Sequence, residues 1–222
     1  MAKKKQKKQR AQSYSLQTVK EVYSYWGKSP LVYRLSSSFF IFDNYLRKKA
    51  VEALELKKGD VVLDLGCGPG IMLKKLQEKV GPEGKIIGVD YVDEMITQCK
   101  KLVARKKWEN VELIRQDAAK LKLKPGSVDA IISIIGLSAM PEHKKALRGC
   151  YSALKRGGRL VVLDGKDFGK GFAFLNPLLK VLRWSKSYER KDIIGEMKKI
   201  FGNAQSREYL LGSTFIAVSA KR

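Results

Sequence analysis

The 222-residue sequence has few of the residues that build metal sites and disulfide frameworks. A single histidine, His143, excludes a histidine-rich metal site, and we expect no metal centre. The three cysteines, Cys67, Cys99 and Cys150, have neither paired nor metal-like spacing, which favours a reducing cytoplasm. No apolar run approaches the roughly 20 residues that span a bilayer. The start, MAKKKQKKQR, lacks the apolar core of a secretory signal, so we expect a cytoplasmic protein.

Acidic residues are scarce as well. Only 22 Asp and Glu stand against 45 Lys and Arg, which leaves a formal net charge of +23. Residues 1–13 read as a basic, disordered tail, because like charges repel and nothing there can be buried. The basic excess continues beyond this tail, so we expect a basic folded body. Such a field attracts either nucleic acid or an anionic membrane surface, and it also favours solubility.

Apolar runs alternate with helical patterns from residue 60 onwards. Strands are predicted at residues 60–66, 85–90, 111–117, 127–135 and 158–164, and helices at 71–80, 92–106 and 141–154. Continuous apolar strands that alternate with helices indicate a parallel sheet covered on both faces, in a doubly wound α/β fold. Two further strands, at 206–211 and 213–222, are separated by about one glycine and must pair antiparallel at the sheet edge.

The first predicted strand runs into a glycine-rich turn with the sequence VVLDLGCGPG, residues 61–70. Its glycines, Gly66, Gly68 and Gly70, follow a G-x-G-x-G spacing that matches neither the dinucleotide fingerprint nor the P-loop. Asp64 stands two residues before the first glycine. A carboxylate there would repel a pyrophosphate and attract an ammonium group. The turn therefore favours a cationic nucleoside over a phosphorylated one.

Carboxylates also end the next two predicted strands. Asp90 ends the second strand and can accept hydrogen bonds from both hydroxyls of a ribose, and Asp117 at the third could accept one from an adenine amino group. Because ligands of open parallel sheets bind beyond the carboxyl ends of the strands, these side chains are expected at one site. The alternative is that each aspartate only caps a helix or a turn.

Five segments now carry a resemblance to a family. In order and spacing, VLDLGCGPG, GKIIGVDYVDEMI, NVELIRQDAAKL, SVDAIIS and GLSAMPEHKKALRGCYSALKRGGRLVVLD resemble the class I S-adenosylmethionine-dependent methyltransferases, over about residues 55–165. The resemblance implies a Rossmann-like, seven-stranded, mostly parallel sheet with an antiparallel last strand, and S-adenosylmethionine as the cofactor. The domain organisation is then the tail, N-terminal helices at 14–56, and a methyltransferase domain at 57–222 with a substrate-side insertion at about 166–192.

The same resemblance implies a cofactor site built from the turns that follow the strands. The glycine turn borders the methionine end of the cofactor, the second strand end holds the ribose, and the third meets the adenine amino edge. Either Tyr91 or Met95 packs on the adenine ring. The full implied set is Asp64, Gly66, Gly68, Asp90, Tyr91, Met95, Asp117, Ala118 and Ile134.

Within that superfamily the sequence is most similar to the menaquinone and ubiquinone C-methyltransferases and related lipid methyltransferases. It departs from the quinone enzymes at substrate-side positions: residues 33–37 read Tyr-Arg-Leu-Ser-Ser for Tyr-Asp-x-Met-Asn, 136–139 read Gly-Leu-Ser-Ala for Gly-Leu-Arg-Asn, and 164–166 read Asp-Gly-Lys for Glu-x-Ser. The cofactor site is therefore carried over, and quinone specificity is not. The catalytic residue stays unknown, with Tyr33, His143 and Asp164 as candidates; we expect His143 to be exposed and non-catalytic.

Residues 170–191, KGFAFLNPLLKVLRWSKSYERK, mix apolar and aromatic residues with lysine and arginine. This composition suits an interfacial helix on anionic lipid, or else an amphipathic helix packed on the core. With the basic tail, it favours a peripheral membrane enzyme of lipid metabolism that methylates a lipid or isoprenoid-type substrate. The alternatives are a soluble small-molecule methyltransferase, an RNA or DNA methyltransferase, or a binding protein that has lost catalysis. The Asn/Asp-Pro-Pro-Tyr/Phe motif of amino-methylating nucleic acid enzymes is missing after the fourth strand.

Overall fold

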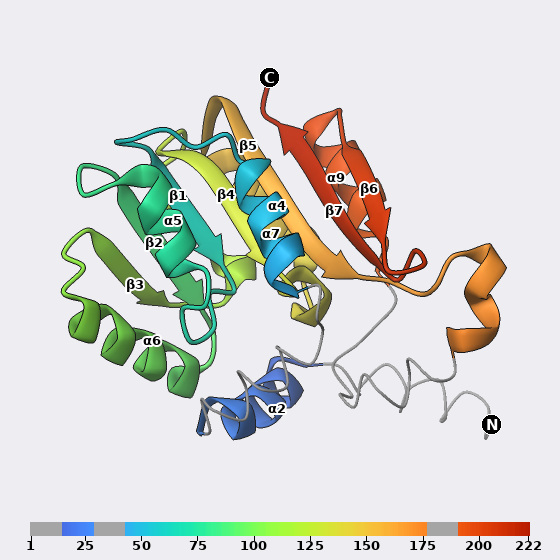
Figure 1. Cartoon of the computed structure of the whole chain (residues 1–222), viewed down its shortest axis with the longest axis horizontal. Coiled ribbons are helices and arrows are strands. Elements are labelled where there is room, and N and C mark those ends of the chain that lie inside the picture. The colour runs from blue at the N-terminus through green and yellow to red at the C-terminus, as the bar shows by residue number, and fades with distance from the viewer. Residues whose placement is uncertain (1–14, 29–42, 177–190) are drawn as a thin grey trace.

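The computed structural model describes residues 15–28, 43–176 and 191–222 (Figure 1). The predicted basic tail, the candidate Tyr33 and much of the predicted interfacial segment lie outside the described residues. Of the predicted N-terminal helices, two fall within them, α2 (Leu16–Lys28) and α4 (Asp43–Glu52).

Among the described residues, seven strands form one sheet in the order β3-β2-β1-β4-β5-β7-β6 (Figure 1). The first five strands pair in parallel, whereas β7 runs antiparallel to both β5 and β6. The predicted α/β fold, doubly wound with a mostly parallel seven-stranded sheet and an antiparallel last strand, is therefore confirmed. The strands are β1 (Val61–Leu65), β2 (Lys85–Asp90), β3 (Val111–Arg115), β4 (Val128–Ile134), β5 (Leu154–Gly165), β6 (Gln205–Tyr209) and β7 (Thr214–Ala220).

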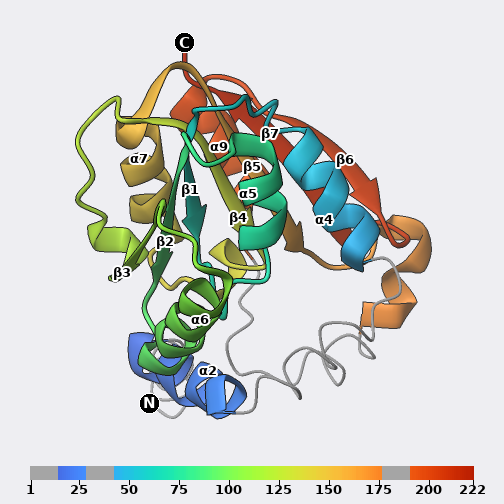
Figure 2. The same cartoon turned by 60° about the vertical axis from the view of Figure 1, so that its left-hand side comes forward.

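Helices cover both faces of the sheet (Figure 2). On one face α4, α5 (Leu73–Val80) and α6 (Asp93–Lys106) pack on the parallel strands, and on the other α7 (His143–Ala153) and α9 (Ile193–Phe201) pack on β5 and β7. Side chains of β1 alternate between the two cores, since Leu63 and Leu65 pack with the α7 and α9 side and Val62 with the α4 side. This double burial explains why the central strands read as continuous apolar runs.

Two elements differ from the sequence-based prediction. Strand β5 begins at Leu154, four residues before its predicted start, and a register shift between Val128 and Ala130 accommodates the early pairing. Helix α9 was not predicted, although Ile193, Met197 and Phe201 recur at a helical spacing and are all buried.

Helix α2 lies at the carboxyl edge of the sheet, beside the start of α6 (Figures 1 and 2). The hydroxyl of Ser24 donates a hydrogen bond of 2.8 Å to Oε2 of Glu94, and this bond holds α2 next to α6. Val19 is 8% exposed, so the helix also buries apolar surface where it docks. The N-terminal helix thereby becomes a wall of the region beyond the strand ends.

A side chain at Gly88, in the middle of β2, would displace its neighbours. A Cβ atom on Gly88 would lie 2.7 Å from Cδ2 of Leu113 and 3.2 Å from Sγ of Cys67. We expect Gly88→Ala to lower the free energy of unfolding by about 1–3 kcal/mol, as overpacking does in rigid cores. Urea denaturation measures this, with Gly149→Ala as the control. Because a Cβ there meets Leu121 at an ordinary 3.4 Å, a comparable loss in the control would contradict the steric argument.

Candidate functional site

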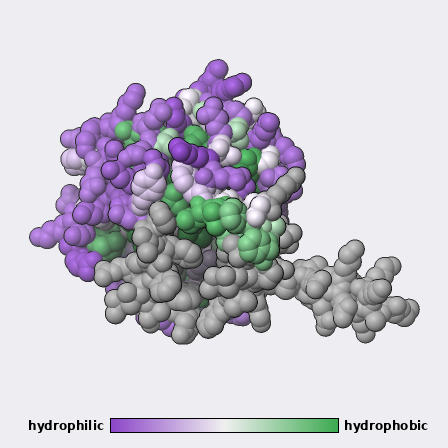
Figure 3. All heavy atoms as spheres, turned by 45° about the vertical axis from the view of Figure 1, so that its right-hand side comes forward, coloured by the Kyte–Doolittle hydropathy of each residue, from purple (hydrophilic) through white to green (hydrophobic). Residues whose placement is uncertain are grey.

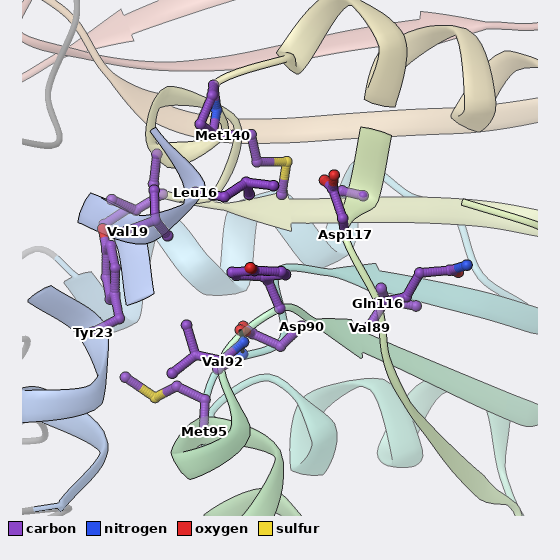
Figure 4. A pocket seen from close by; sticks show the side chains of 18 of the residues that line it. Leu16, Val19, Tyr23, Val89, Asp90, Val92, Met95, Gln116, Asp117 and Met140 are labelled. Carbon is purple, nitrogen blue, oxygen red and sulfur yellow. Dashed lines mark hydrogen bonds between the residues drawn. The ribbon is translucent and has the colours of Figure 1, made fainter. Parts of the chain in front are cut away.

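A pocket opens at the carboxyl ends of β1, β2, β3 and β4 (Figure 4). It holds about 680 Å³ of empty space, part of it open to solvent. Strands β1 and β4 are neighbours in the sheet. The chain continues from β1 to β2 on one side of this pair and from β4 to β5 on the other. In doubly wound folds such a switch point is where ligands bind.

The pocket brings together eight of the nine residues predicted to bind the cofactor. They come from four separate strand ends, which the parallel topology places at one edge. These residues are Gly66, Gly68, Asp90, Tyr91, Met95, Asp117, Ala118 and Ile134. The ninth, Asp64, does not line the pocket.

The glycine turn after β1 has a left-handed backbone. Gly66, Gly68 and Gly70 have φ angles of 78°, 54° and 87°, which residues other than glycine rarely adopt. A Cβ on Gly66 would lie 3.4 Å from Cε of Met140 and 3.5 Å from Cα of Gly136, on the facing wall. The absence of side chains therefore keeps the backbone of the turn accessible from the pocket.

Asp90 fastens this turn to the end of β2. One carboxylate oxygen accepts a 2.9 Å hydrogen bond from the Gly68 amide, and the other accepts one of 2.9 Å from the Val92 amide. Burial raises the pKa of Asp90, and these backbone donors act in the opposite direction. Because a carboxylate has about four acceptor positions, two remain for hydroxyl groups of a ligand.

Asp117 has a local role that the sequence left open. Its Oδ1 accepts a 3.0 Å hydrogen bond from the Ala119 amide and so caps the short helix η1 (Ala118–Lys120). The same residue borders the pocket, at the wall formed by the end of β3 (Figure 4). Capping and ligand contact are therefore compatible for this aspartate.

Asp64 lies behind the glycine turn, on the α4 side of the sheet. It is 1% exposed, because the alternation along β1 turns it away from the pocket and under α4. Burial raises its pKa to about 7, while the guanidinium of Arg47 on α4 lowers the pKa and the carboxylate of Asp90 raises it. Its Oδ2 has no hydrogen-bond partner among the described residues. We expect Asp64 beside the ligand from the sequence, but the structure places its carboxyl group behind the pocket wall.

A methyltransferase domain family matches residues 56–204 of the chain. The chain belongs to this methyltransferase family. A demethylmenaquinone methyltransferase of Lactobacillus johnsonii is 30% identical to it over 181 residues, which is 81% of this chain and 70% of the relative. One from Listeria monocytogenes serotype 4a is 29% identical over 164 residues, which is 70% of this chain and 69% of the relative.

Solved structures with the same fold include an S-adenosylmethionine-dependent methyltransferase from Aquifex aeolicus, with a TM-score of 0.59 and 22% identity over 78% of this chain and 88% of its own. The YcgJ protein from Bacillus subtilis has a TM-score of 0.64 and 23% identity over 74% of this chain and 71% of its own. The protein is an S-adenosylmethionine-dependent methyltransferase.

The pocket of this methyltransferase fits that cofactor, which supplies an activated methyl group on a sulfonium when bound. The glycine cradle leaves the backbone of the turn free for close approach. Two carboxylates, Asp90 at the pocket and Asp64 behind it, favour a cationic ligand over a phosphate. We expect Asp90 to hold the ribose hydroxyls.

The candidate base Asp164 lies outside the pocket of the methyltransferase. It is completely buried, and its oxygens accept hydrogen bonds from the amides of Ser138 (2.9 Å) and Gly165 (2.8 Å). The ammonium of Lys191 donates to the carbonyls of Ser138 (2.8 Å) and Met140 (2.7 Å). Together these bonds hold the short helix η2 (Leu137–Ala139) against the end of β5, so Asp164 shapes the pocket wall instead of facing it.

The prediction that His143 is exposed is wrong, because its side chain is only 9% exposed. His143, Ala146, Leu147 and Cys150 form the buried face of α7, at a spacing that could have revealed this from the sequence. Burial lowers the pKa of His143, which keeps the imidazole neutral at neutral pH. Like Asp164, it does not line the pocket.

Sequence reasoning missed the apolar wall that faces the cofactor turns. Leu16, Val19 and Tyr23 of α2 point into the pocket from one side (Figure 4), and Ala139 and Met140 border it from η2. The three α2 residues recur at a helical spacing that indicates a buried face, but the pattern does not tell what that face covers.

Replacing Asp90 tests the ribose assignment. We expect Asp90→Ala to weaken S-adenosylmethionine binding about 100-fold, since two hydrogen bonds to a charged group are together worth about 3 kcal/mol. Calorimetric titration measures the affinity. The melting temperature should also fall, because the variant loses the bonds to Gly68 and Val92. Asp93→Ala is the control, since Asp93 is half exposed and pairs with Arg115 instead; equal affinities of the two variants would refute the assignment.

Asp64 makes the stability of the methyltransferase depend on pH. Its pKa is about 7 in the folded protein and about 3.9 in an unfolded chain. The stabilisation is therefore complete below about pH 4 and is lost as pH rises through 7, by up to about 1.4 kcal/mol per pH unit. Denaturation from pH 4 to 8 should show a flatter profile for Asp64→Asn than for wild type. A control variant, Glu109→Gln at an exposed carboxyl, should keep the wild-type slope.

Proposed function

We propose that this methyltransferase transfers its methyl group to a lipophilic acceptor of the isoprenoid-quinone type, taken from a membrane surface. The observation that carries the proposal is the apolar wall of the pocket, contributed by Leu16, Val19, Ile135, Ala139 and Met140. Such a wall suits a flat, apolar ring, because the contact removes apolar surface from water on both sides. It offers little to a phosphorylated or strongly polar acceptor.

The named relatives support the same acceptor class. Two demethylmenaquinone methyltransferases are similar to this chain over most of its length, at 29% and 30% identity. The substrate-side motifs nevertheless differ, since residues 136–139 read Gly-Leu-Ser-Ala here. Ala139, one of the two residues that differ, borders the pocket, so part of this difference falls on the wall that would contact the acceptor. We infer that the chain accepts a related ring by shape and apolar contact and not by the same polar contacts.

The residues of the chain contribute alignment and exclusion of water. In a reduced quinone, an ionised ring hydroxyl makes the adjacent ring carbon nucleophilic. That carbon would take the methyl group as the bond between the methyl carbon and the sulfonium sulfur breaks, which would leave the donor as a neutral thioether. The ring would regain aromaticity by losing a proton to solvent at the open side of the pocket. The described titratable side chains that line the pocket are Tyr23, Asp90, Tyr91 and Asp117. Asp90 and Asp117 already accept hydrogen bonds from backbone amides, which is consistent with a reaction that needs no dedicated base.

A membrane surface as the source of the acceptor follows from its chemistry. An isoprenoid chain partitions into lipid, so the enzyme must reach its acceptor at a bilayer. None of the helices in the described ranges is long and apolar enough to cross a membrane. The net charge of +23 favours peripheral binding to anionic lipid.

Methyl-labelled S-adenosylmethionine tests the acceptor class. We expect label in the organic phase when the protein is incubated with a reduced, demethylated naphthoquinone that carries an isoprenoid chain, in anionic vesicles. Mass spectrometry should show a gain of one methyl group on the ring. The same incubation with total RNA, and with the soluble fraction of a lysate, serves as comparison. Label that enters only RNA, or only small polar molecules, would overturn the proposal and favour one of those acceptor classes.

A further inference from the structure

We propose that the turn between β6 and β7, together with the short helix η3 (Lys170–Leu175), forms a preorganised surface that inserts into an anionic lipid bilayer. This docking surface consists of Leu211 from the turn and of Phe172 and Phe174 from η3. The proposal rests on the proposed lipid acceptor and names the part of the molecule that contacts the membrane.

The docking surface holds most of the large apolar side chains that are exposed in the described ranges. Five large apolar side chains are exposed among the described residues, and three of them belong to this surface. Phe174 is 75% exposed, Leu211 53% and Phe172 40%. Figure 3 turns this side of the molecule forward and shows an apolar area within an otherwise hydrophilic surface. Contiguous exposed apolar area of this kind marks an interaction site.

The backbone of the turn is unfavourable for the leucines that occupy it. Leu210 and Leu211 have φ angles of 50° and 57°, and the Gly212 amide donates a 3.0 Å hydrogen bond to the Tyr209 carbonyl. This is the geometry of a type I′ turn, whose central positions strongly favour Asn and Gly. Leu210 packs on the core, but Leu211 points to solvent, so packing does not account for it. A residue that is both strained and exposed points to a function at that position.

The turn and the start of the insertion are fastened to each other. The Lys166 amide donates to the Ser213 carbonyl at 2.8 Å, and the Gly169 amide donates to the Leu211 carbonyl at 3.3 Å. The ammonium of Lys166 also pairs with the Glu208 carboxylate. Two segments that are more than 40 residues apart in sequence therefore present one surface, and little conformational freedom is lost when it binds.

The sheet topology places this surface at the same edge as the cofactor pocket. Strand β6 is antiparallel to β7, and β7 is antiparallel to β5, so β5 and β6 end at the edge where β1 and β4 end. Figure 1 shows η3 and the β6–β7 turn on the side of the sheet that also carries α2. A bilayer at the docking surface would therefore lie along the edge from which a lipid acceptor enters the pocket.

Positive charge together with exposed apolar side chains favours an anionic bilayer as the partner. The chain carries a net charge of +23, and the sequence directly after η3, residues 177–190, contains four basic residues and one acidic residue. Apolar side chains beside a basic sequence are typical of proteins that bind the interface of anionic membranes.

Flotation of the full chain with vesicles tests the proposal without reference to catalysis. We expect binding to vesicles that contain phosphatidylglycerol and much weaker binding to pure phosphatidylcholine. Leu211→Gly should reduce the bound fraction about tenfold, which corresponds to burial of one leucine side chain. Its melting temperature should equal or exceed that of the wild type, because glycine adopts the left-handed turn without strain. Loss of binding in such a variant cannot result from unfolding.

Matched variants separate apolar contact from other effects. Leu211→Phe retains an apolar side chain and should bind as the wild type does, whereas Phe172→Ser with Phe174→Ser should lose binding as Leu211→Gly does. Equal flotation of wild type, Leu211→Gly and the double variant would overturn the docking surface, as would equal binding to both kinds of vesicle.

The acceptor assay separates this proposal from the proposed function. If the protein floats through these residues but labels only RNA or polar molecules, the docking surface stands and the quinone acceptor fails. If it methylates a short-chain quinone but does not float, the acceptor stands and the docking surface is refuted.

Discussion

Burial of the parallel strands on both faces is the constraint on which the rest of the molecule depends. A strand that is covered by α4, α5 and α6 on one side and by α7 and α9 on the other has little room for a polar side chain along its length. Polar groups therefore collect where strands end. Because parallel strands all end at one edge, the turns after β1, β2, β3 and β4 converge and produce a pocket at the switch point. The pocket is in this sense a consequence of the core.

Asp90 shows how one side chain serves both the fold and the site. Its carboxylate holds the amides of Gly68 and Val92, which belong to the turns after two different strands. Those bonds set the shape of the cradle before any ligand arrives, so less reorganisation is needed on binding. Asp164 does the same for the other wall, where it and Lys191 hold η2 from the end of β5. Each of these two pocket walls is therefore held in place by hydrogen bonds from another segment of the chain.

Asp64, like Asp164 in β5, departs from the rule that buried strands are apolar. It lies within β1, is almost fully buried, and faces Arg47 of α4. Its charge costs stability at neutral pH, yet it places negative potential behind a pocket that takes a cationic cofactor. Both N-terminal helices therefore contribute to the site. The guanidinium of Arg47 on α4 lies near the Asp64 carboxyl group, and α2 supplies part of the apolar wall.

The sequence by itself determined the order of strands and helices, the doubly wound sheet and the identity of eight residues that line the pocket. The strands and helices follow from continuous apolar runs that alternate with helical patterns. Gly66, Gly68, Asp90 and Asp117 follow from the glycine turn and from carboxylates at strand ends, whereas the other four pocket residues are implied only by the resemblance to a family. Only the tertiary structure places Asp64 under α4, buries Asp164 away from the pocket, closes one side of the pocket with α2, and joins the β6–β7 turn to the segment before η3. Each of these depends on contacts between segments far apart in the chain, and a side chain's exposure or pKa is set by those contacts and not by its neighbours in sequence.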